Sequence, residues 1–224
     1  MDGKGSNGYL TVIIDDAGSG DLLFGVVIGA FRSETQEFKY GIIDVKFYQD
    51  LFGKKEYFQE ASDIASKLVS DLKLGSEEEI QVCQGNIFDL AVADLQKIYG
   101  ERRVTRIKVT GEAQRLVEIA YLDELRNLGY QPLEERETKR AKSFFHMMRW
   151  LKENPSMLLY AKTGWPRLKR YNLFRPFHRE LMHVALCGNC GSKCEVPFKP
   201  DPRRPVFCRS CWKKRKGFKK RKAT

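Results

Sequence analysis

Residues 9–31 read YLTVIIDDAGSGDLLFGVVIGAF and decide the fold of the first half of the chain. Residues 9–16 form a β-branched, apolar run typical of a buried strand, and residues 22–31 form a second such run. The AGSGD between them has the glycines and the aspartate of a turn. A short turn between two strands predicts an antiparallel pair, with Asp15 and Asp16 at the end of the first strand.

The segments that follow predict a third strand and then an alternation of helices and strands. The strand patterns cover residues 38–47, 80–84 and 104–109, and the helix patterns cover residues 54–74, 86–99 and 112–128. Short turns between the first three strands indicate an antiparallel meander, and the later alternation indicates parallel crossovers with helices packed on a mixed sheet. We therefore expect an α/β domain over residues 9–132, after a flexible N-terminus at residues 1–8.

The element order, the acidic first strand and the turn sequence IDDAGSG resemble the ribonuclease H-like fold. Holliday-junction resolvases, ribonucleases H and several transposases share this fold. Its nucleases hold two divalent metals with three or four carboxylates, and the metals activate water for phosphodiester cleavage. The resemblance implies Asp16 as a ligand of Mg²⁺ or Mn²⁺ in the first strand, and Glu112 as the acid near the start of the last helix.

The chain also departs from that family pattern. The fourth strand of resolvase-like proteins usually ends in an acid, whereas here it ends in Cys83-Gln84-Gly85. Glu112 equally fits a plain stabilising role at a helix N-terminus. Two interpretations therefore remain open for the domain, a metal-dependent endonuclease and a non-catalytic relative that binds nucleic acid or protein.

Charge divides the chain into an acidic and a basic part. Residues 1–138 carry 16 Lys/Arg and 25 Asp/Glu, a net charge of −9, whereas residues 139–224 carry 24 Lys/Arg and 4 Asp/Glu, a net charge of +20. Such a basic segment favours a polyanionic partner, and nucleic acid is the commonest polyanion inside cells. The sequence has no amphipathic helix with the strong apolar face that favours an acidic membrane surface.

Residues 133–183 are expected to form a basic connector. Residues 134–153 predict an amphipathic helix that Pro155 closes, and residues 160–179 interleave Lys/Arg with aromatic residues. The interleaving suits phosphate contacts with base stacking, and it equally suits docking of the aromatic rings on the domain. The basic residues that we assign to nucleic-acid contacts, here and further along the chain, are Arg167, Lys169, Arg170, Arg175, Arg203, Arg204, Lys213, Lys214, Arg215, Lys216, Lys219, Lys220, Arg221 and Lys222.

Four cysteines near the C-terminus form the pattern C-x₂-C-x₁₇-C-x₂-C, which predicts a zinc site. They are Cys187, Cys190, Cys208 and Cys211. Four thiolates close the coordination shell of Zn²⁺, so the ion is expected to be structural, because a catalytic zinc keeps an open position for water. We expect a zinc ribbon over residues 184–212, with short strands at residues 195–199 and 205–207, and place Cys194 and Cys83 outside the site.

The stretch from Cys187 to Cys211 reads CxxCG and then V-P-F-x-P-x-P-x-R-P-V-x-C-x-x-C, which resembles a zinc-ribbon family found in many uncharacterised proteins. The resemblance implies binding of nucleic acid or protein and no particular reaction. A basic tail follows at residues 213–224, and its lysines and arginines are suited to phosphate contacts that release counterions.

The start of the chain, MDGKGSNG, has no apolar core of a signal peptide, and no apolar run approaches the ~18 residues of a membrane span. We therefore expect a cytoplasmic protein with reduced cysteines. The leading interpretation is a protein that binds structured RNA, in the ribosome or another ribonucleoprotein, because no recognition-helix motif for duplex DNA is present. The alternative is a nuclease of the ribonuclease H or resolvase class that acts on DNA or RNA.

Overall fold

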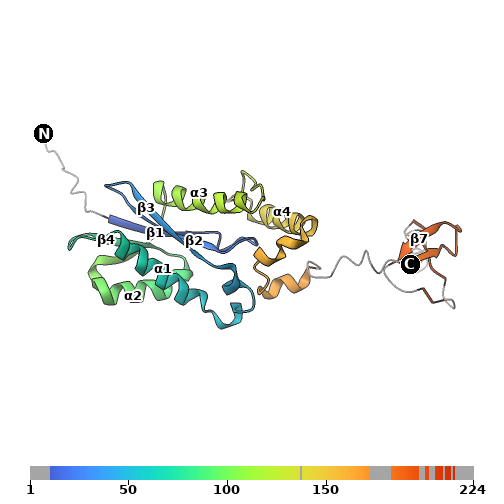
Figure 1. Ribbon diagram of the computed structural model, residues 1–224, viewed down its shortest axis with the longest axis horizontal. Coiled ribbons are helices and arrows are strands. Elements are labelled where there is room, and N and C mark those ends of the chain that lie inside the picture. The colour runs from blue at the N-terminus through green and yellow to red at the C-terminus, as the bar shows by residue number, and fades with distance from the viewer. Residues whose placement is uncertain are drawn as a thin grey trace, which may run out of the picture. The chain divides into compact units, whose positions relative to one another are not determined.

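The structure, a computed structural model, describes residues 11–136, 138–171, 183–196, 200–201, 205–208, 210–212 and 214. The N-terminus expected to be flexible lies outside these residues. The described residues fall into two compact units, one up to residue 171 and one from residue 183. The larger unit combines a five-stranded sheet with helices on both of its faces (Figure 1).

The sheet of the larger unit has the strand order β3-β2-β1-β4-β5. Its strands are β1 (Thr11–Ala17), β2 (Val26–Arg32), β3 (Glu37–Ile43), β4 (Glu79–Cys83) and β5 (Val104–Ile107). β2 pairs antiparallel with both β1 and β3, whereas β4 pairs parallel with both β1 and β5. The expected mixed α/β sheet is thus confirmed, and the acidic first strand lies at its centre.

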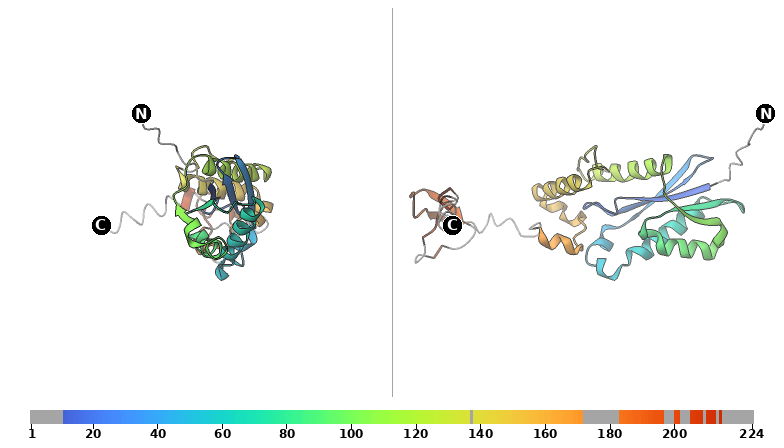
Figure 2. Two further views of the ribbon diagram at one scale, coloured as in Figure 1. Left: turned by 90° about the vertical axis from the view of Figure 1, so that its left-hand side faces the viewer. Right: turned by 180° about the vertical axis from the view of Figure 1, so that it is seen from behind.

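The helices form a layer on each face of the sheet. They are α1 (Tyr57–Asp71), α2 (Asp89–Tyr99), α3 (Glu112–Asn127) and α4 (Arg140–Glu153). α1 and α2 cover one face, and α3 covers the other, where α4 continues its layer; the view from behind shows the same arrangement (Figure 2). Short 3₁₀ helices span Val45–Tyr48 (η1), Phe52–Lys54 (η2), Asn86–Phe88 (η3), Glu101–Arg103 (η4), Pro155–Tyr160 (η5) and Pro166–Arg170 (η6).

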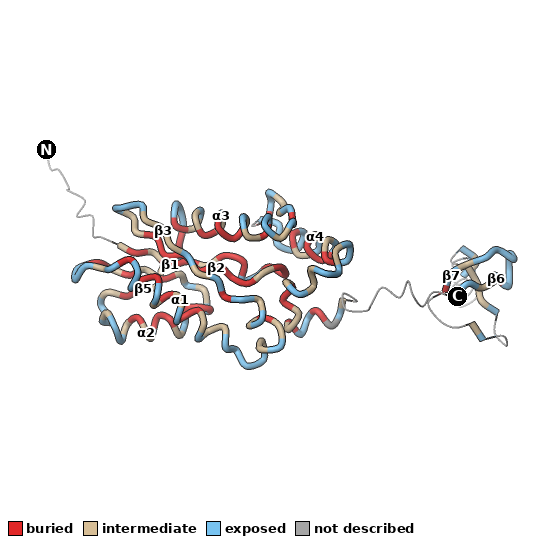
Figure 3. Tube along the Cα trace, viewed as in Figure 1, coloured by how far each residue is buried: buried red, intermediate tan, exposed pale blue. Residues whose placement is uncertain are grey.

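The core follows from the alternation of side chains along the central strands. Val12 and Ile14 of β1 pack with α1 and α2, whereas Ala17 belongs to the cluster that α3 and α4 cover. Buried residues are accordingly concentrated along β1 and β2 (Figure 3). Full burial of each large aliphatic side chain contributes about 1.5–3 kcal/mol, so the two apolar layers hold the acidic end of β1 in place.

The basic connector packs on the sheet as part of the larger unit. Backbone hydrogen bonds join the connector to the segment just before β2, from Phe24 N to the carbonyl of Tyr160 at 2.7 Å and from Lys162 N to that of Leu22 at 2.9 Å. A Cβ atom at Gly164 would lie 2.1 Å from a backbone oxygen, so the close approach of the chain there requires glycine. Residues 138–171 therefore belong with the domain expected at residues 9–132.

Two details of the connector differ from the expectation. The helix expected from residue 134 begins at Arg140, because residues 134–136 form a turn that carries Arg136 into the interior. Trp165 is buried in the core with Leu168 beneath α4, so its ring docks the connector and is not available for stacking on a base.

The smaller unit contains a two-stranded antiparallel hairpin, β6 (His183–Leu186) and β7 (Lys193–Val196). Residues 205–208 have no strand, so the strand expected at residues 205–207 does not form, and residues 210–212 begin a helical turn. Residues 197–199 of the other expected strand lie outside the described residues. In the part of the chain that the structure describes, no helix has the length and apolar character needed to cross a membrane.

Candidate metal centre and acidic cleft

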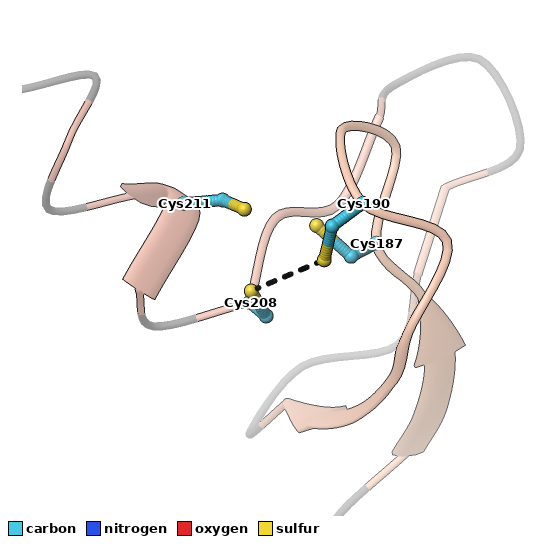
Figure 4. Close-up of side chains that lie close together, drawn as sticks. All are labelled: Cys187, Cys190, Cys208 and Cys211. Carbon is cyan, nitrogen blue, oxygen red and sulfur yellow. Dashed lines mark hydrogen bonds between the residues drawn. The ribbon is translucent and has the colours of Figure 1, made fainter.

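Four cysteine side chains converge in the smaller unit (Figure 4). Cys187 and Cys190 come from the turn between β6 and β7, and Cys208 and Cys211 come from the start of the helical turn. All four Sγ atoms lie within 4.8 Å of one another, and those of Cys190 and Cys208 are 3.7 Å apart. Tetrahedral Zn²⁺ with Zn–S bonds of ~2.3 Å places its sulfurs roughly 3.8 Å apart. The arrangement fits this ion.

The local backbone geometry directs the four cysteine side chains toward a common centre. Gly191 adopts a left-handed φ of 72°, which glycine accepts without strain, and its N–H donates to the carbonyl of Cys187 at 2.8 Å. In the second pair, Trp212 N donates to the carbonyl of Cys208 at 2.9 Å, as in a helix. A turn and a helix start thus supply two thiols each.

Hydrogen bonds shift the pKa values of two thiols of this centre in opposite directions. Backbone N–H groups of Cys208, Asn189 and Cys190 lower the pKa of Cys187 to about 6. The Asn189 amide lowers the pKa of Cys211, but hydrogen bonds with the neighbouring thiols outweigh it and raise that pKa to about 11. Four thiolates this close repel one another unless a metal ion offsets their charge.

Cys194 lies on β7 outside the four-cysteine centre. It pairs with Ala185 of β6, and its Sγ is 3.5 Å from the Ala185 carbonyl oxygen. With all four positions supplied by the paired cysteines, the smaller unit carries a structural zinc site, as the spacing predicts.

A second cluster of potential metal ligands lies where β1 and β4 end. Asp15, Asp16 and Cys83 offer ligand atoms within 4.8 Å of one another and line a cleft of about 280 Å³. The parallel register of β1 and β4 sets Ile14 opposite Val82, so the residues that follow each of them meet at the same edge of the sheet. Ligand sites of α/β proteins commonly lie at this edge.

Burial controls the charge of this cluster. Burial raises the pKa of Asp16 to about 6; a hydrogen bond with Ser19 opposes this rise, and the charge of Asp15 adds to it. The pKa of Asp15 is raised by the same cause. Burial and a hydrogen bond with Asp15 raise the pKa of Cys83 to about 12, so the group is a thiol at neutral pH. A bound cation would favour the charged form of both carboxylates.

Lys162 of the connector reaches the turn that follows Asp16. Its side chain is 0% exposed, and its Nζ donates to the Gly18 carbonyl at 2.5 Å. Burial lowers the pKa of Lys162 to about 7, and the charges of Asp21 and Asp16 oppose that shift. The connector therefore fixes the loop that carries the acidic cluster.

Arg136 joins two further acids at the cleft. It forms ion pairs with Asp21 at 2.5 Å and with Glu118 of α3, and its guanidinium carbon lies 5.0 Å from the ring centroid of Tyr121. Arg136 and Asp21 are buried. Because the arginine charge offsets these carboxylates, they are held in a structural network rather than free to bind a metal.

The structure places the two predicted acidic ligands apart. Asp16 lines the cleft, whereas Glu112 is exposed at the start of α3, where it forms an ion pair with Arg115 and is not among the cleft-lining residues. Gln114 and Glu118 of α3 line the cleft instead. Their spacing of four residues beside the apolar face of the helix is the signal that could have identified them.

The predicted nucleic-acid contacts are described only in part. Arg167 and Arg170 are exposed on the larger unit, and Lys214 is exposed on the smaller one. Lys169 lies within η6, and its side chain is not described. The predicted contacts that lie outside the described residues are Arg175, Arg203, Arg204, Lys213, Arg215, Lys216, Lys219, Lys220, Arg221 and Lys222.

Residues 179–216 match a protein-family model described as a probable treble clef zinc finger. The matched segment includes the four converging cysteines, and the family description supports the structural zinc site derived from their geometry. It names a treble clef where the cysteine spacing and the family resemblance led us to expect a zinc ribbon. Curated proteins offer no match to this chain.

Proposed function

We propose that this protein binds nucleic acid, with structured RNA in the ribosome or another ribonucleoprotein as its target. The observation that carries the proposal is that a closed four-cysteine zinc site lies within residues 139–224, whose net charge is +20. A closed coordination shell holds a fold together and leaves no position for a substrate. Basic residues carried by such a folded unit are suited to binding the phosphate backbone of a nucleic acid.

The proposal is tested with the full chain and three labelled nucleic acids, a structured RNA, duplex RNA and duplex DNA of equal length. Fluorescence anisotropy at 50 and 200 mM salt gives the affinity and its salt dependence. Each phosphate contact makes the slope of the logarithm of the binding constant against the logarithm of the salt concentration more negative by roughly 0.7–0.9. Removal of residues 213–224, which carry eight Lys/Arg, should weaken binding and reduce this slope.

A control replaces Lys54 and Lys55, which are exposed in the acidic part of the chain at residues 1–138, by glutamine. This variant should retain the wild-type affinity and slope. Affinity that neither falls with salt nor changes on removal of residues 213–224 would refute the proposal. Tighter binding to duplex DNA than to structured RNA would refute the choice of target.

A second candidate is a divalent-metal-dependent nuclease of the ribonuclease H or resolvase class. The antiparallel β1–β2–β3 meander followed by two parallel strands supports this fold for the larger unit, as do the acids at the end of the central strand. Asp15 and Asp16 have the hard oxygen ligands that Mg²⁺ or Mn²⁺ prefers. Cys83 supplies a softer ligand, and Arg136 pairs with Glu118, so the described residues suit one such ion better than two.

The nuclease candidate is tested by incubating the protein with Mg²⁺ or Mn²⁺ and branched DNA, an RNA–DNA hybrid or structured RNA. Metal-dependent cleavage that Asp16→Asn abolishes and Glu112→Gln retains would support a site in the cleft. Lack of cleavage of all three substrates with either ion would refute the nuclease candidate.

A further inference from the structure

Beside the acidic cleft, α4 and residues 167–171 of the connector form a second pocket of about 400 Å³. Its walls include Phe144 and Phe145 of α4 and Tyr171 at the end of the described connector. The volume lies in the range of roughly 300–1,000 Å³ that is common for small-molecule sites. Gly20 and Arg140 line both this pocket and the acidic cleft, so the two cavities adjoin.

The aromatic rings of this pocket present both faces and edges. Tyr171 lies 5.7 Å from Phe144 and 5.8 Å from Phe145, measured between ring centroids, with interplanar angles of 57° and 78°. The side chain of Phe145 is 51% exposed. An exposed aromatic side chain at the mouth of a pocket offers a flat surface to a ligand ring.

Two arginines give this pocket a positive charge. The guanidinium carbon of Arg167 lies 5.2 Å from the ring centroid of Phe144 and 4.4 Å from that of Trp165. Stacking holds the guanidinium in place while its N–H edge can still donate to a phosphate. Among residues 11–136 and 138–171, no ion pair includes Arg140 or Arg167, and the charge of Arg140 acts on Asp16 across the adjoining cleft.

We infer that this pocket receives one unpaired base of a nucleic-acid strand, with the adjoining phosphates on Arg140 and Arg167. The aromatic rings of Phe145 and Tyr171 contact the base, with a ring face stacked on its plane or a ring edge packed against it. Aromatic rings and stacked arginines are the groups that bind splayed bases in single-stranded loops, whereas a paired base inside a duplex cannot enter such a pocket. The inference rests on the proposed function and assigns the place on the larger unit where an unpaired nucleotide binds.

The test compares a labelled RNA hairpin that has an unpaired loop with a blunt RNA duplex of the same length. Phe145→Ala should weaken binding of the hairpin by roughly 5- to 150-fold, the effect of losing one stacked base, and leave binding of the duplex within about twofold. Phe145→Tyr, which keeps the ring, should bind as the wild type does. Phe145→Leu keeps apolar bulk without a π-face and should behave like Phe145→Ala.

Two further variants separate stacking from charge and from general damage. Arg167→Lys keeps the charge and loses the planar stack, so it should weaken hairpin binding with an unchanged salt slope. Leu159→Ala alters an apolar side chain of η5 that is 59% exposed and does not line the pocket, and it should change nothing. Circular dichroism of each variant checks that its fold is retained.

Each outcome bears on either the pocket or the proposed function. If the wild type binds the hairpin and Phe145→Ala lowers hairpin and duplex affinity equally, or lowers neither, the pocket assignment is wrong and nucleic-acid binding stands. If the wild type binds neither RNA, the pocket assignment and the proposed function are both wrong. Displacement of the hairpin by an equal concentration of a free nucleoside monophosphate would assign the pocket to a free nucleotide and overturn the inference of a strand.

Discussion

Replacement of Lys162 by methionine should change how the stability of the larger unit depends on pH. The amine is fully buried, and its Nζ donates to the Gly18 carbonyl. Burial lowers its pKa from 10.5 to about 7; the charges of Asp21 and Asp16 oppose this shift, and that of Arg136 adds to it. Between these two pKa values the unfolded chain binds more protons than the folded chain. The wild-type free energy of unfolding therefore rises with pH.

The magnitude follows from the two pKa values of Lys162. The rise is at most about 1.4 kcal/mol per pH unit, and pKa values of about 7 and 10.5 give about 2 kcal/mol between pH 7 and pH 9. The cost of burying the charge is greatest below pH 7 and vanishes above pH 10.5. Methionine lacks this contribution at every pH. It also removes one of the two donors to the Gly18 carbonyl, which still accepts from Asp21 N at 3.0 Å, a loss of about 0.5–1.5 kcal/mol that is independent of pH.

Urea unfolding of the full chain at pH 7 and pH 9, without added Mg²⁺ or Mn²⁺, measures the effect. Tryptophan fluorescence reports on the larger unit, since the ring centroid of Trp165 lies 5.7 Å from the Nζ of Lys162. Lys97→Met, at an exposed lysine of α2, is the control and should keep the wild-type pH dependence. Equal pH dependence in the wild type and in Lys162→Met would refute the assignment of a depressed pKa to this amine.

Three further predictions concern the metal and the packing. Cys211→Ser should lower the bound zinc from about one ion per chain, whereas Cys194→Ser should keep it; atomic absorption of the purified proteins decides this. Arg136→Met removes the ion-pair partner of the buried Asp21 and the half-buried Glu118 and should lower the free energy of unfolding by about 3–5 kcal/mol in urea, against about 0–1 kcal/mol for Arg126→Met at an exposed pair. Gly164→Ala places a Cβ 2.1 Å from a backbone oxygen and should cost about 1–3 kcal/mol in the same assay; no measurable loss would contradict the tight docking of the connector.

The order of the elements and the zinc ligands were predictable because their signals are local. Alternating and helical patterns within a dozen residues indicated five strands and four helices of the larger unit, with shifted ends. The spacing of the four cysteines indicated their common site, since each C-x-x-C pair forms one turn. Cys194 was excluded on the same ground, and it lies outside the four-cysteine cluster.

The composition of the acidic cleft depended on contacts between distant segments. Asp16 was identified from its turn sequence, but the proximity of Asp15 to Cys83 follows from the register of β1 against β4. Glu118, rather than Glu112, reaches the cleft because of the way α3 is rotated on the sheet. A rotation of this kind is decided by packing, which a single helix pattern does not contain.

Only the tertiary structure decided the role of the connector. Its aromatic and basic residues fitted both docking and nucleic-acid contact, and the structure divides them: Trp165 is buried, whereas Phe145 is half exposed beside two arginines. Lys162 bonds to a residue 144 positions earlier in the chain. Sequence determined which chemical groups this protein has and which short segments carry them. Packing over long separations determined which groups meet, because burial and proximity arise only when those segments close on one core.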